Sequence, residues 1–230
     1  ECKLKSTKYG EYWCCIEEVE RILKNFGPYV SAVSLYRDKL LKPVAKYCGT
    51  AILQRLHIRW LRDGQVERLI TKLKSIFQRM LALSFHGCHL MTLVPCPSTY
   101  IDCDSLIELE IRHSGHCAAI MRNTFPKLER FTFIGNTMFS EEDEYNFSDI
   151  LPNFLLRHHK RLTTLNLCSD SVYCSSQLME IIINKCTELT NLTLDSWYSP
   201  RASFNFSHLN NLHKLRKLAV VIRKIDHRQL

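Results

Sequence analysis

The feature that most restricts the fold of this chain is a short apolar pattern that recurs along most of its length. The pattern is apolar-x-x-apolar-x-apolar, where x is any residue, and successive copies begin 22 to 34 residues apart. Six of the seven steps lie within or next to ~20 to 29 residues, a common length for structural repeats. Eight regularly spaced copies therefore predict a repeat architecture. They begin at Val30, Leu53, Met80, Leu106, Leu128, Leu162, Leu189 and Leu215.

The last two apolar residues of each copy alternate with polar neighbours, as in Leu165-Asn166-Leu167. This period of two is typical of a strand that is buried on one face only. A single copy cannot bury that face, whereas stacked copies pair their strands in parallel and merge their apolar residues into one core.

Several connectors between the copies carry apolar residues three and four positions apart, which predicts helices. The clearest are residues 65–76, 147–157 and 175–186. We therefore predict an α/β fold, a leucine-rich-repeat solenoid of about eight repeats. Its parallel strands would line the concave face of a horseshoe, and its helices the convex face.

Three segments carry a resemblance to a known family. Residues 125–136 (Phe-Pro-Lys-Leu-Glu-Arg-Phe-Thr-Phe-Ile-Gly-Asn) and 186–194 (Cys-Thr-Glu-Leu-Thr-Asn-Leu-Thr-Leu) resemble repeats of the intracellular F-box family, and the likeness covers residues 19–225. Ser84-Phe-His-Gly-Cys88 is similar to the strand exit of that family's cysteine-containing repeats, where the thiol packs below the turn. The resemblance implies substrate recognition for a cullin-RING ubiquitin ligase.

The domain organisation follows from the same resemblance. We expect residues 1–18 to be a segment that follows a missing upstream module, and residues 19–230 to be the repeat domain. Residues 1–18 are too few for an F-box, so a ligase adaptor would bind only through that missing module. An alternative is a free-standing repeat protein, a scaffold or an inhibitor, which binds its target without changing the target's lifetime.

The residues between and just after the core positions should point to the concave face, one row from each repeat. We predict that this face binds a protein substrate, although single charged residues there could simply be solvated. The cluster of Arg55, His57 and Arg59 is the strongest candidate. The predicted binding residues are Tyr36, Arg55, His57, Arg59, His86, Glu108, Glu110, Arg112, Arg130, Asn166 and Asp195.

Aromatic residues and one long step could add to this surface. Trp60, Trp197 and Tyr198 fall just beyond strand ends, where they either contact a partner or cover the edge of the core. The longest step, from Leu128 to Leu162, contains the acidic run 140–144. We expect a capped helix there with a short acidic loop, and a binding loop is the alternative.

Composition restricts the environment and the partners. The 11 cysteines show no disulfide framework spacing, which favours reduced thiols in the cytoplasm or nucleus, so three N-x-[ST] sequons are interpreted as chance matches. The sequence holds no apolar run long enough for a membrane span. The net charge of +8 permits nucleic acid as a partner, but the basic residues are not grouped with aromatics in the sequence, so we do not expect it.

The sequence contains no motif for catalysis, so we expect no enzyme activity and no cofactor. Two groups contain possible zinc ligands, residues 86–89 and 113–117, but neither has the paired spacing of a zinc site, and we expect no metal. His158 and His159 are predicted to be solvated at the end of a helix.

Overall fold

The computed structural model describes residues 16–36, 40–48, 53–61, 80–88, 90, 104–115, 117–135, 141–168, 176–195 and 206–221. Contacts within the chain divide it into two compact units, Glu1–Leu128 and Glu129–Leu230. Each unit is described by itself.

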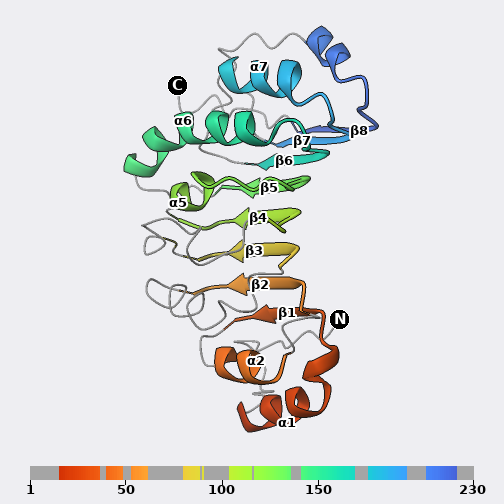
Figure 1. Cartoon of the computed structure of the whole chain (residues 1–230). Coiled ribbons are helices and arrows are strands. Elements are labelled where there is room, and N and C mark those ends of the chain that lie inside the picture. Colours follow the sequence, from red (N-terminus) through yellow and green to blue (C-terminus); the bar gives the residue numbers. More distant parts are fainter. Residues whose placement is uncertain are drawn as a thin grey trace. The chain divides into compact units, whose positions relative to one another are not determined.

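The strands form an eight-stranded sheet whose order follows the chain from β1 to β8 (Figure 1). The pairs within each unit are parallel. The predicted α/β fold with sequential parallel strands is therefore confirmed. The first unit contains β1 (Ala32–Leu35), β2 (Arg55–Arg59), β3 (Ala82–His86) and β4 (Glu108–Arg112), and the second contains β5 (Arg130–Ile134), β6 (Thr164–Cys168), β7 (Asn191–Asp195) and β8 (Lys217–Val221).

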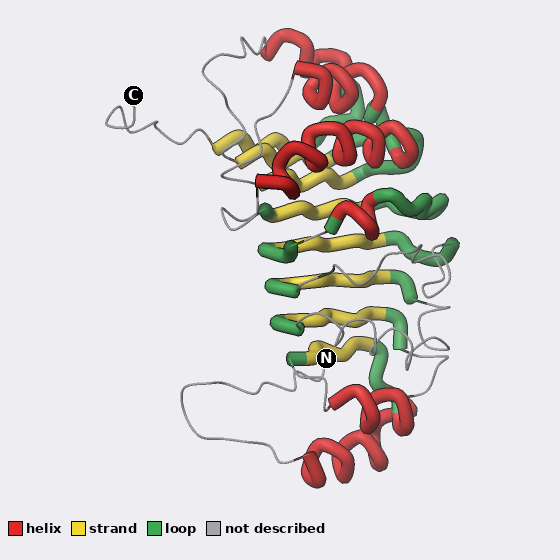
Figure 2. The backbone as a smooth tube through the Cα atoms, turned by 90° about the vertical axis from the view of Figure 1, so that its left-hand side faces the viewer, coloured by secondary structure: helices red, strands yellow, loops and turns green. Residues whose placement is uncertain are grey.

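Helices occupy several of the connectors (Figure 2). Two of the three helices predicted from apolar spacing are confirmed as α6 and α7, and the third, over residues 65–76, lies outside the described residues. None of the described helices combines the length and apolar composition needed to cross a bilayer. The helical elements are α1 (Ile16–Phe26), η1 (Gly27–Tyr29), α2 (Leu41–Tyr47) and α5 (Ala118–Met121) in the first unit, and α6 (Glu141–His158), α7 (Ser176–Lys185) and η5 (Phe206–Asn211) in the second.

The repeated apolar residues form the cores of both units. In β2 the burial pattern alternates, with Leu56 and Ile58 fully buried and their neighbours more exposed. In the second unit α6 packs against the buried face of β5. The ring of Phe154 on α6 lies 4.5 Å from the ring of Phe131 on β5, measured between centroids. The prediction that the repeated apolar residues face inward is confirmed from Leu53 to Leu194.

One backbone contact recurs where each strand begins. The carbonyl oxygen of Gln54 accepts hydrogen bonds from the N–H groups of Leu81 (2.9 Å) and Ala82 (3.0 Å) in the next repeat. In the second unit the carbonyl of Thr163 does the same with Thr190 (2.8 Å) and Asn191 (3.1 Å). These paired bonds align each strand with the next, so side chains at the same repeat position lie side by side.

The apolar prediction holds only in part at the two end copies of the pattern, although Val33 and Leu35 of the first copy are buried. Val30 is only half-buried, and Leu218 of β8 is 43% exposed although the pattern placed it in the core. A residue in the middle of a stack has a repeat on each side, whereas β8 is the last strand of the sheet and has a strand neighbour on one side only.

The longest repeat step is filled by α6, which begins at Glu141, so the predicted helix start is confirmed. Carboxylates suit the first turn of a helix because the backbone N–H groups there are positive. The prediction that His158 is solvated at the end of this helix is wrong, since it is 4% exposed. His158 lies one turn after Phe154, with ring centroids 4.5 Å apart, and the same helix face carries both into the core.

Candidate functional site

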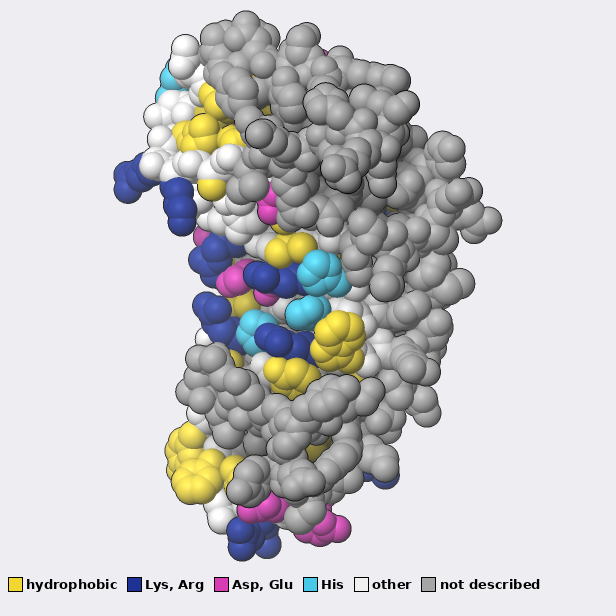
Figure 3. Space-filling model, turned by 180° about the vertical axis from the view of Figure 1, so that it is seen from behind, with side chains coloured by type: hydrophobic (Ala, Val, Ile, Leu, Met, Phe, Trp, Pro, Cys, Tyr) yellow, Lys and Arg dark blue, Asp and Glu magenta, His cyan; other side chains and the backbone are white. Residues whose placement is uncertain are grey.

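The candidate site is the polar face of β2, β3 and β4 in the first unit. The register of these strands arranges nine side chains in three rows, each row running across the three strands. We call these nine residues the strand grid. Basic, acidic and histidine side chains lie close together on this face of the molecule (Figure 3). The rows are Arg55, Ala82 and Glu108; His57, Ser84 and Glu110; and Arg59, His86 and Arg112.

The first row contains an ion pair that spans three strands. Arg55 Nη1 on β2 lies 3.5 Å from Glu108 Oε2 on β4. Neighbouring strands are about 4.8 Å apart, so this pair reaches across β3. It can do so because Ala82, which is 5% exposed, presents only a methyl group between the two side chains.

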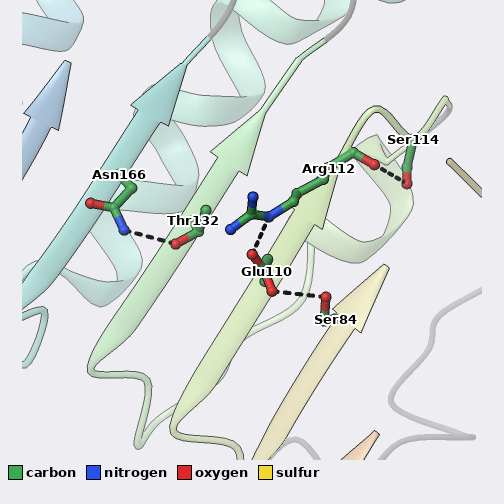
Figure 4. A network of polar contacts seen from close by, with 6 residues as sticks. All are labelled: Ser84, Glu110, Arg112, Ser114, Thr132 and Asn166. Carbon is green, nitrogen blue, oxygen red and sulfur yellow. Dashed lines mark hydrogen bonds and ion pairs between the residues drawn. The ribbon is translucent and has the colours of Figure 1, made fainter. Parts of the chain in front are cut away.

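The second and third rows are linked through Glu110 (Figure 4). One carboxylate oxygen of Glu110 accepts a hydrogen bond from Ser84 Oγ at 2.9 Å, and the other pairs with Nε of Arg112 two residues further along β4. The Glu110 side chain is 18% exposed, so solvent screens this pair less than an ion pair on the open surface. The network holds Glu110 and Arg112 in one orientation on the face.

The third row ends at aromatic residues. The guanidinium carbon of Arg59 lies 5.3 Å from the centroid of the Tyr36 ring, within the range of a cation–π contact. Trp60 follows β2 directly and is 62% exposed. The prediction that Trp60 lies just beyond a strand end is confirmed.

The structure brings most of the predicted binding residues together in the first unit. Arg130, Asn166 and Asp195 belong to the second unit, and Trp197 and Tyr198 lie outside the described residues. Those in the first unit, on or beside the strand grid, are Tyr36, Arg55, His57, Arg59, Trp60, His86, Glu108, Glu110 and Arg112.

Ser84 and His113 were not among the predicted binding residues, although the alternation placed Ser84 on the polar face. Ser84 sits between charged rows and is 7% exposed, but it donates to Glu110. His113 follows β4 just as Trp60 follows β2. The shared position after the strand was a signal that could have identified His113 from the sequence.

The polar face of the second unit carries a different chemistry. Its cross-strand contacts join mainly uncharged groups: Asn166 Nδ2 donates to Thr132 Oγ1 at 3.0 Å (Figure 4), and Asn191 Nδ2 donates to Thr164 Oγ1 at 3.2 Å. Further along, Cys168 Sγ donates to Asp195 at 3.1 Å. Such ladders stabilise strand pairing, and the strand grid of the first unit is the more charged candidate surface.

The cysteine after β3 has a structural role. The Cys88 thiol is fully buried and lies 3.5 Å from the carbonyl oxygens of Ile58 and His86. The backbone N–H of Cys88 donates to Ser114 Oγ at 3.1 Å. Burial raises its pKa, and burial raises the pKa of Cys186 to about 12. Both therefore remain thiols at neutral pH and are poor nucleophiles.

The two groups that contain possible zinc ligands, in which no metal was expected, are only partly described, since His89 and His116 lie outside the described residues. Among the His, Cys, Asp and Glu residues that the structure does place, no three are grouped so that they could hold a metal ion.

The sequential parallel strands show an α/β fold that is consistent with a solenoid like those of leucine-rich repeats. Comparison with models of known protein families gives no match to this chain. Curated proteins give no significant match either. The function is therefore argued from the fold and from the strand grid.

Proposed function

We propose that this chain is a protein-binding repeat domain, without catalytic activity, that holds a partner protein on the strand grid of β2, β3 and β4. The observation that carries the proposal is the alternation of charges over this face. The strand register brings Arg55 and Glu108 together as one ion pair, and Arg112 and Glu110 form a second within β4. Charges of both signs at set positions favour recognition of one complementary protein surface.

A finer version of the proposal rests on the sequence resemblance to F-box repeats. In that version the chain recognises substrates for a cullin-RING ubiquitin ligase, with the adaptor held by a module outside residues 1–230. The alternative is a scaffold or inhibitor that acts without a ligase. The two differ in one measurable consequence. Removing the chain from cells should lengthen the half-life of a bound ligase substrate, whereas the half-life of a scaffold's partner should not change.

Charge reversal of the grid is the direct test. We expect the double variant Arg55→Glu, Arg59→Glu to bind the partner about tenfold more weakly, which corresponds to about 1.4 kcal/mol. It should fold normally, because an exposed ion pair such as Arg55 with Glu108 contributes about 0 to 1 kcal/mol. Partners that the wild-type chain enriches are identified by mass spectrometry, and their affinities are then measured by calorimetry.

The matched control is the double variant Arg122→Glu, Lys127→Glu. Both residues are exposed, belong to the same unit and lie in the segment between α5 and β5, which contributes no residue to the strand grid. The change in net charge is the same as in the test variant. Equal affinity of the test variant and the wild-type chain would exclude the strand grid as the binding surface.

A further inference from the structure

Three aromatic rings lie in a row at the carboxyl ends of β2, β3 and β4. The rings of Trp60 and His86 have centroids 5.3 Å apart, and those of His86 and His113 are 5.6 Å apart, with interplanar angles of 37° and 46°. We call these three residues with Arg59 and Tyr36 the strand-end cluster. The rings of Trp60, His86 and His113 form a continuous row across three successive strands, and Tyr36, which follows β1, extends the cluster to a fourth.

The residues that directly follow β2, β3 and β4 share an unusual backbone conformation. Trp60, Gly87 and His113 occupy the same position after three successive strands, and all three have positive φ angles of 57°, 62° and 46°. This left-handed conformation is unfavourable for a residue with a side chain, because the Cβ atom lies too close to the following carbonyl oxygen. The Trp60 N–H donates to the His86 carbonyl at 2.8 Å, and the Gly87 N–H to the Arg112 carbonyl at 2.9 Å.

The Trp60 ring lies directly against Gly87, and it can do so because glycine has no Cβ atom. A Cβ atom added at Gly87 would be 2.4 Å from Cε3 of Trp60, so the ring rests directly on the glycine. Trp60 nevertheless remains 62% exposed. Backbone strain concentrated at an exposed aromatic residue is typical of a binding site.

The positive charge of the face is concentrated beside these rings. Arg55 and Arg112 are paired with carboxylates, whereas Arg59 has no carboxylate within 4.0 Å among the described residues. Its guanidinium lies over the Tyr36 ring, a contact that does not use the N–H groups, so these can still donate hydrogen bonds.

We propose that the strand-end cluster binds an acidic segment of the partner protein, with a carboxylate at Arg59 and His86 and the carbon chain of that residue against Trp60. This inference rests on the proposed function and names the chemistry of the partner. A carboxylate accepts two parallel hydrogen bonds from a guanidinium group. An acidic side chain would also contribute a methylene group to the exposed ring.

The surrounding charges favour an acidic peptide over single-stranded nucleic acid. Grouped aromatic and basic residues can also stack bases, and the structure groups them here although the sequence does not. Glu108 and Glu110 lie on the same face, however, and would repel a phosphate chain that follows the strand grid. Separate carboxylates on a peptide can avoid them.

The protonation of His86 should make binding of the acidic segment depend on pH, which provides a second test. The groups that face it are Arg59 on β2, and Arg112, His113 and Glu110 on β4 or at its end. Burial, followed by the charges of Arg59, His113 and Arg112, lowers the pKa of His86 below its ordinary 6.5, and Glu110 opposes the shift. A carboxylate bound beside His86 would raise this pKa, so binding takes up a proton and tightens as the pH falls from 7.5 to 6.0. Glutamate side chains remain ionised over this range.

The test uses a fluorescein-labelled hexaglutamate peptide, the full 230-residue chain and fluorescence anisotropy. We expect Arg59→Gln to weaken binding about fivefold or more, while Arg122→Gln, the same change at an exposed site in the same unit, stays within about twofold of the wild type. We expect the wild type to bind more tightly at pH 6.0 than at pH 7.5, and His86→Gln to lose most of that gain. Thermal unfolding of each variant, followed by circular dichroism, checks that it is folded.

Two outcomes would overturn this inference: equal binding of the peptide by Arg59→Gln and the wild type, or an Arg59-dependent affinity for deca-thymidylate that exceeds the affinity for hexaglutamate.

Failure of the proposed function would give a different pattern of results. If the natural partner is lost in the Arg55→Glu, Arg59→Glu variant while hexaglutamate binding ignores Arg59, the proposed function stands and the acidic segment is wrong. If neither binding depends on Arg59 or Arg55, both proposals fail.

Discussion

Leu155→Ala should lower the free energy of unfolding of the second unit by about 2 to 5 kcal/mol. Leu155 lies on α6 and is fully buried. The helix contacts the sheet through this face, where the Phe154 ring also meets Phe131. Truncation removes apolar contact area and leaves a cavity that close-packed neighbours fill only in part. Urea unfolding followed by circular dichroism measures the loss.

The neighbouring residue provides the control. Leu156 is on the same helix and has the same side chain, but it is 39% exposed. Leu156→Ala changes helix propensity by the same small amount as Leu155→Ala, so we expect a loss of less than about 1 kcal/mol. Equal effects of the two substitutions would mean that α6 does not pack on the sheet through the face that carries Leu155.

Gly87→Ala is expected to destabilise the first unit by about 1 to 3 kcal/mol and to displace the Trp60 ring. The positive φ of 62° disfavours any residue with a Cβ atom. The new methyl group would also overlap the ring, 2.4 Å from Cε3. Because Trp60 is largely exposed, its ring can swing away. We therefore expect weaker hexaglutamate binding together with a lower urea midpoint.

Gly115→Ala is the matched control for this change. A Cβ atom added at Gly115 meets nothing within 4 Å, and its backbone does not have the left-handed conformation of Gly87. We expect its unfolding midpoint and its peptide affinity to stay close to those of the wild type, or its stability to rise slightly. If Gly87→Ala behaved like Gly115→Ala, the contact between Gly87 and Trp60 would not organise the strand-end cluster.

The candidate site could be predicted from the sequence only in outline. Alternation along each strand identified Arg55, His57 and Arg59 as neighbours on one polar face, because side chains two residues apart point the same way. The pairing of Arg55 with Glu108 was not predictable, since the two residues are 53 positions apart. It depends on Ala82 lying between them in the parallel register.

The ring row of Trp60, His86 and His113 shows the same limit. Nothing in the sequence distance between these residues predicts that the His86 ring lies within 6 Å of both the Trp60 ring and the His113 ring. Trp60 and His113 follow a strand, whereas His86 ends one. The contacts between their rings therefore depend on the left-handed conformation after the strands and on the absence of a side chain at Gly87.

The sequence by itself determined the repeat, the buried and exposed faces of each strand, and the helices α6 and α7. These follow from local periodicity, because a side chain's direction is set by its own backbone conformation. Only the tertiary structure decided which polar groups meet, that His158 is buried and that Leu218 is exposed. Those outcomes depend on the strand register and on the neighbouring repeats, and local periodicity reveals neither when successive copies begin 22 to 34 residues apart.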